Sequence, residues 1–135
     1  MAGYGMEIKI SGTLEDVKAQ VAEALKTQGF GILTEIDMQR TMKTKLGVDF
    51  KPYLILGACN PNYAFRALSA DESIGLLLPC NVVLWQDADG VAVCIQDPEV
   101  MFSVVDAETK EAMAGFPQEV KRSLQFALEA LKRNN

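Results

Sequence analysis

Two cysteine-asparagine pairs are the residues of this chain with the most specific chemical potential. Cys59-Asn60 lies in the stretch LILGACNPNYAF, and Cys80-Asn81 lies in GLLLPCNVVLWQ. A thiolate is a nucleophile, a ligand for soft metal ions and one half of a disulfide, so two thiols that meet can support redox, sulfur-transfer or metal chemistry. Cysteine is also among the most buried residue types, and two thiols that only fill a core are the alternative interpretation.

The chain contains no histidine. Ser-His-Asp and Cys-His nucleophile activation, the facial-triad iron site and the common histidine zinc site all require an imidazole. Only thiol, carboxylate, lysine and backbone chemistry remain. The sequence therefore favours a binding protein over an enzyme, and we assign no catalytic residue, no metal ligand and no cofactor.

Length and composition predict one globular domain over residues 1–135. The chain is 49% hydrophobic and 23% charged, with a net charge of −5 at pH 7. A negative field repels phosphate, and no basic stripe offsets it, so we expect no nucleic-acid partner. There is no apolar run of about 18 residues and no signal peptide, so we expect no membrane partner and a cytoplasmic location where the three cysteines stay reduced.

Hydrophobic periodicity and turn residues place the elements along the chain. Thr13 is a predicted helix N-cap, and Pro79 predicts a bulge or an edge position within the fourth strand. The order of elements predicts an α+β fold in two layers, with one mixed sheet of about five strands and helices packed mainly on one face. The predicted strands are residues 4–10, 30–37, 53–58, 74–86 and 91–96; the predicted helices are residues 13–28, 61–68 and two after residue 98, while residues 38–47 are a short helix or a loop.

Four short elements, in this order and over nearly the whole chain, resemble the family called domain of unknown function 302 (DUF302). That resemblance implies a compact domain whose curved sheet is backed by helices, similar in outline to the TATA-binding-protein fold and often a homodimer. It implies no settled activity. The four elements are Asn60-Pro61, Leu78-Pro79, Asp89-Gly90 and Asp97-Pro98.

A ligand-binding site is predicted where the third and fourth strands meet, because strands linked by a crossover tend to lie close together. Cys59 would stand just outside a helix N-terminus, where the helix dipole favours a thiolate. The amide of Asn81, in an apolar strand, must bond to backbone or line a cavity. The predicted site consists of Cys59, Asn60, Pro61, Cys80 and Asn81, together with Lys51 and Tyr53, which enter the strand that ends at Cys59.

Three functions follow as hypotheses. The leading one is a domain that binds a small ligand or a partner as a homodimer, with Phe116 and Phe126 as a dimer surface or as further core contacts. The second is a redox or sulfur-transfer protein in which Cys59 attacks and Cys80 resolves. The third is a protein that binds Cu(I) or Zn²⁺ through the same two thiolates.

Overall fold

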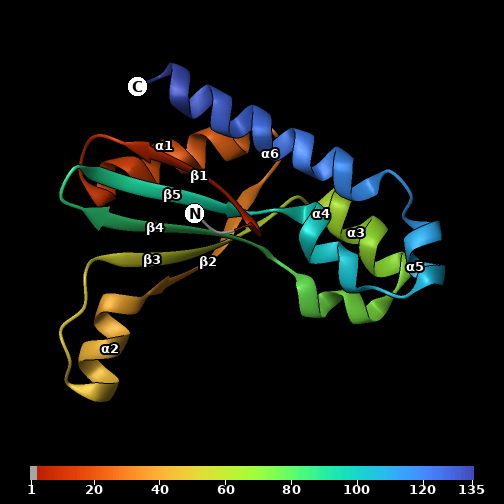
Figure 1. Ribbon diagram of the computed structural model, residues 1–135, viewed down its shortest axis with the longest axis horizontal. Coiled ribbons are helices and arrows are strands. Elements are labelled where there is room, and N and C mark those ends of the chain that lie inside the picture. The colour runs from red at the N-terminus through yellow and green to blue at the C-terminus, as the bar shows by residue number, and fades with distance from the viewer. Residues whose placement is uncertain (1–2) are drawn as a thin grey trace.

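The computed structural model describes residues 3–135, which form one five-stranded sheet with helices (Figure 1). The strand order is β1-β5-β4-β3-β2, and every neighbouring pair is antiparallel. The predicted α+β class is confirmed, whereas the prediction of a mixed sheet is wrong. The chain leaves β3 and re-enters β4 at the same end of the sheet, which reverses its direction. The strands are β1 (Gly5–Ile10), β2 (Gly31–Asp37), β3 (Tyr53–Cys59), β4 (Cys80–Asp87) and β5 (Gly90–Gln96).

The helices occupy three places around this sheet (Figure 1). Helices α1 (Leu14–Lys26) and α6 (Phe116–Arg133) pack against each other over one face. Helix α2 (Met38–Leu46) projects from the connection between β2 and β3. No helix within residues 3–135 is both long and apolar enough to cross a membrane. Beyond one end of the sheet lie α3 (Pro61–Ala70), the 3-10 helix η1 (Glu72–Leu77), α4 (Pro98–Met101), the 3-10 helix η2 (Phe102–Val104) and α5 (Ala107–Ala112).

The core lies between the sheet and the pair α1 and α6. Side chains at alternate strand positions point to the same face, and here one set is buried, whereas most of the other set is not, Ala92 excepted. Full burial of each large aliphatic side chain stabilises the fold by about 1.5–3 kcal/mol. The large buried side chains of the strands include Leu54, Leu56, Val82, Leu84, Val91, Val93 and Ile95, and the helices contribute Val17, Val21, Leu25, Val120, Leu124, Leu128 and Leu131.

The predicted extent of the fourth strand is wrong. Residues 72–77 form a 3-10 helix, and β4 begins only at Cys80, so Pro79 precedes the strand instead of interrupting it. Proline has no N–H to donate to the strand ladder, which explains why pairing starts after it. Phe116 is 3% exposed and belongs to the core, whereas Phe126 is 56% exposed.

Pro79 packs over the backbone of β3 at Gly57. The Leu78-Pro79 peptide bond is cis. A Cβ added to Gly57 would lie 2.7 Å from Cγ of Pro79 and would also overlap Oγ1 of Thr34. Any larger residue at this position must therefore push the proline ring away from the sheet.

We predict that Gly57→Ala lowers the free energy of unfolding by about 1–3 kcal/mol, because it overpacks this contact. Gly31→Ala is the matched control: it also lies in a strand, yet a Cβ there meets nothing within 4 Å. Urea denaturation of both variants measures the difference. Equal stabilities for the two variants would contradict the proposed role of Gly57.

Candidate functional site

Cys59 and Cys80 line the same hollow, where β3 ends and β4 begins. Its volume is about 20 Å³, and Phe30, Tyr63 and Phe116 close it with aromatic rings. A space of this size holds roughly one water molecule. The structure thus brings the two cysteines together but leaves no room beside them for a substrate.

The surroundings of Cys80 favour the neutral thiol. Burial raises the pKa of Cys80 to about 11, and the neighbouring Cys59 adds to the rise. Its side chain is 7% exposed, and all three cysteines are free thiols. Activated cysteines need the opposite environment, one that lowers the pKa.

Metal ligands are sparse around the two thiols. Over residues 3–135, no group of three or more histidine, cysteine, aspartate or glutamate side chains is placed to hold a metal ion. Two thiols in one chain supply half of the four ligands that a structural zinc site uses. A metal site built on Cys59 and Cys80 would need further ligands from elsewhere.

Asn60 and Pro61 have a structural role that uses both polar atoms of the Asn60 side chain. Oδ1 of Asn60 accepts hydrogen bonds from the backbone N–H groups of Asn62 (3.1 Å) and Tyr63 (3.3 Å), which caps α3. Its Nδ2 donates to the backbone carbonyl of Gln28 (3.2 Å), and so ties the start of α3 to the end of α1. Pro61 occupies the first turn of α3, where a missing N–H costs nothing.

Asn81 and Tyr53 lie on the other face of the sheet, which α1 and α6 do not cover. They line a hollow of about 310 Å³, which we call the open-face hollow. Consecutive strand residues point to opposite faces, so Cys80 enters the core while Asn81 faces outward. The predicted seven-residue site is therefore divided by the sheet into two places. The open-face hollow is lined by Tyr4, Gly5, Tyr53, Asn81, Val83, Cys94, Gln96 and Met101.

The open-face hollow is mainly apolar, with a few polar groups and no charged side chain in its lining. Asn81 is exposed, and its side chain forms no hydrogen bond within the described part of the chain. Burial raises the pKa of both Tyr53 and Cys94, so both stay protonated and neutral at pH 7. Gln96 adds a second amide. The lining thus offers hydrogen-bond donors and acceptors without an ion.

Cys94, Gln96 and Tyr4 were not predicted as site residues. A usable signal was present in β5, where the apolar residues at 91, 93 and 95 alternate with Cys94 and Gln96. This period places the two polar residues together on one face. Gly5 leaves room for the thiol, because a Cβ there would lie 2.6 Å from Sγ of Cys94.

Lys51 is engaged by Asp87 and is not free to bind a ligand. Its Nζ lies 2.7 Å from Asp87, which also accepts from Nζ of Lys9 (3.1 Å) and from Nε1 of Trp85 (3.1 Å). The two lysines hold the pKa of Asp87 down at about 2. The indole fixed in this way stacks on Tyr53, with ring centroids 5.8 Å apart and planes inclined by 6°. Lys51 therefore positions an aromatic pair beside the hollow.

Comparison with known proteins identifies the family. The family model described as domain of unknown function DUF302 matches residues 6–131. This chain belongs to the DUF302 family. It is similar to the crystal structure of an uncharacterized conserved DUF302 protein from Bacillus stearothermophilus, with 26% sequence identity, a TM-score of 0.82, and coverage of 96% of this chain and 99% of that chain. No curated protein matches.

In this DUF302 chain the elements that carried the resemblance build the fold. Asp97 accepts from the backbone N–H of Glu99 (2.9 Å) at the start of α4, and pairs with Lys121 of α6 (2.9 Å). Asp89 and Gly90 turn the hairpin between β4 and β5. Together with the Asn60 cap and the packing of Pro79, these contacts hold the fold of this chain together.

We predict that Cys80 resists alkylation in the folded chain below about pH 9 and reacts progressively faster towards its pKa of about 11.

The same pKa shift predicts how stability depends on pH. Because folding raises the pKa of the Cys80 thiol from 9.0 to about 11, the stability due to the buried thiol is fully present below pH 9.0 and is lost as the pH rises through about 11. Iodoacetamide labelling followed by peptide mass spectrometry measures the labelling rate against pH, with urea-unfolded protein as the control, and urea denaturation at each pH measures the stability. Fast labelling of folded Cys80 at pH 7 would refute the assignment.

Proposed function

We propose that this DUF302 domain binds a small, uncharged, planar ligand in the open-face hollow. The observation that carries the proposal is a mainly apolar hollow of about 310 Å³ whose lining includes an exposed amide, Asn81, without a hydrogen-bond partner in the described residues. Binding sites typically combine an apolar surface with a few convergent polar groups. Val83 and Met101 supply apolar surface here, and the amides of Asn81 and Gln96 supply the polar groups.

The chemistry of the lining selects the ligand class. An ion would be desolvated in this hollow without an opposite charge from its lining, which is costly. Each amide presents a donor and an acceptor, the pattern that matches a carboxamide or the edge of a heterocycle. The volume is about twice that of the engineered cavity of about 150 Å³ that binds benzene, so one ring with a substituent fits.

We predict that neutral planar amides bind and that Asn81→Leu weakens them about tenfold, which corresponds to the loss of about one hydrogen bond. Nicotinamide, benzamide and uracil are the probes, and nicotinate is the charged isostere expected to bind more weakly. Chemical-shift titration of the full chain measures the affinities. Asn134→Leu, at the exposed C-terminus, is the matched control, and failure of all three neutral probes would contradict the proposal.

The same face supports a homodimer. The strand register aligns Ile36, Ile55 and Val83 in one row across β2, β3 and β4. Ile36 is 47% exposed, and Leu33 on the same edge strand is 67% exposed. Contiguous apolar surface of this kind marks interaction sites, and the family resemblance also implies a homodimer. We propose that a second copy of the chain covers this row.

We predict that Ile36→Lys converts the homodimer to a monomer, because the buried ammonium would lack a partner. Light scattering during gel filtration measures the mass. Leu76→Lys is the matched control, since Leu76 is 89% exposed on η1, far from the row. A monomeric parent chain, or a dimer that tolerates Ile36→Lys, would count against this interface.

A thiol redox function is the second candidate, because Cys59 and Cys80 share one hollow. Oxidation would join the two sulfurs and pass two electrons and two protons to a disulfide-containing oxidant. The raised pKa of Cys80 opposes its role as a nucleophile, and also as a thiolate ligand for Cu(I) or Zn²⁺. Labelling of Cys59, the attacking thiol of this hypothesis, in the same iodoacetamide experiment separates these candidates from a purely structural pair of thiols: fast labelling of folded Cys59 at pH 7 supports the redox candidate.

A further inference from the structure

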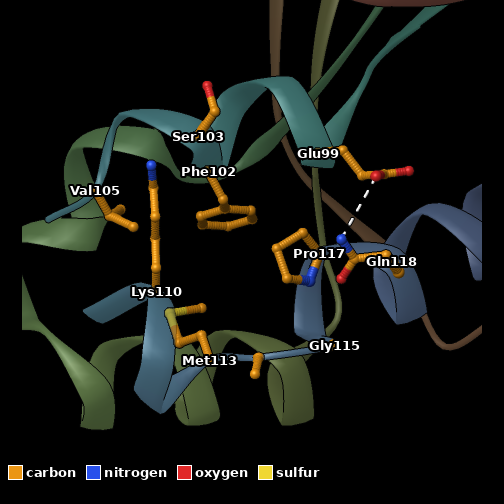
Figure 2. A pocket seen from close by; sticks show the side chains of 10 residues that line it. Glu99, Phe102, Ser103, Val105, Lys110, Met113, Gly115, Pro117 and Gln118 are labelled. Atoms are coloured by element: carbon orange, nitrogen blue, oxygen red, sulfur yellow. Dashed lines mark hydrogen bonds between the residues drawn. The ribbon is translucent and has the colours of Figure 1, made fainter. Parts of the chain in front are cut away.

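A second sizeable hollow lies among the helices beyond the end of the sheet. It measures about 290 Å³ and is enclosed by η2, α5 and the start of α6 (Figure 2). Phe102, Met113 and Pro117 give it an apolar floor. It shares no lining residue with the open-face hollow, so a ligand could bind here whether or not the open-face hollow binds one.

Lys110 is the unpaired charge of this hollow. Its side chain rises from α5 between Val105 and Phe102 (Figure 2), and its ammonium forms no ion pair within residues 3–135. The one carboxylate in the lining, Glu99, is already occupied: it lies 3.3 Å from Nζ of Lys121 and accepts from Gln118 at 3.5 Å. The lining therefore carries an exposed ammonium that no carboxylate contacts, next to an apolar surface.

The other acidic groups near Lys110 do not neutralise it by contact. Asp106, four residues earlier, accepts the backbone N–H of Thr109 (2.8 Å) as the cap of α5. Glu108 and Glu111 are separated from Lys110 by two positions and one position, spacings that do not face each other on a helix. Their charges lie on the exposed surface of α5, where solvent screens them.

The start of α6 contributes a potential of the same sign as Lys110. Gly115 begins this helix with a positive φ of 83°, and no side chain within the described residues caps it. The end of a helix dipole that points into the hollow is positive. The start of α6 therefore favours a negatively charged ligand. The position of the proposed site follows from the ammonium of Lys110 and the apolar floor.

We propose that this hollow binds a small carboxylic acid with an apolar body. The carboxylate pairs with Nζ of Lys110, and the body packs on Phe102 and Met113. A charge-assisted hydrogen bond is about twice as strong as a neutral one, which makes Lys110 the selective contact. The volume is about twice that of a cavity that holds benzene, so an acid with a single ring or a short aliphatic chain fits.

The test uses phenylacetate and hexanoate as probes, with phenylacetamide as the neutral isostere. Titration of the isotope-labelled full chain should give saturable shifts at the backbone amides of Gly115 and Gln118. Lys110→Gln should weaken phenylacetate about tenfold and leave phenylacetamide unchanged. Lys45→Gln is the matched control, because Lys45 is an exposed lysine on the distant helix α2.

A second variant fills the space instead of removing the charge. Ala114 is exposed in the lining, so Ala114→Trp should block both acids without disturbing the core. Unchanged binding in either Lys110→Gln or Ala114→Trp would overturn the proposal. Shifts confined to the open-face hollow, or no saturation by either acid up to about 10 mM, would overturn it as well.

Discussion

The organisation of this domain depends on the one-sided cover of its sheet. Residues of alternate strand positions separate into two sets, and α1 and α6 bury only one of them. The buried set supplies most of the hydrophobic stabilisation. The other set is left uncovered by these two helices. Its members form the wall of Tyr53 and Trp85, the apolar row through Ile55, and the uncharged hollow beside them.

Where β3 ends and β4 begins, the helices are held in place by contacts between elements that are distant in sequence. Asn60 joins the start of α3 to the end of α1, and Asp97 joins α4 to α6 through Lys121. Around these contacts the rings of Tyr63 and Phe116 pack edge to face, with centroids 5.7 Å apart. This packing closes the space beside the two cysteines and accounts for their small hollow. Residues of the family pattern thus build the scaffold, while the hollows of about 290 and 310 Å³ are lined mostly by residues outside that pattern.

Much of the fold was predictable because local signals and tertiary packing agree. The Asn60-Pro61 helix start, the hairpin before Gly90 and the Thr13 cap all appear where the sequence placed them. The strand predicted over residues 74–86 was too long, because a short apolar run fits a strand or a buried helical turn equally well. The sequence left Phe116 open between a dimer surface and the core, because its position at a break between helices says nothing about which surface it meets. Packing against Phe102 and Tyr63 decided that it is buried.

The sequence by itself determined which chemistry is available and where the elements begin. The absence of histidine, the capping residues and the alternation in β5 are local properties that need no partner to be read. Only the tertiary structure decided which face of the sheet the helices cover, because that choice depends on contacts between residues far apart in the chain. For this reason Cys80 and Asn81, adjacent in sequence, have separate environments. The thiol is sealed in the core with a raised pKa, and the amide opens onto the uncovered face.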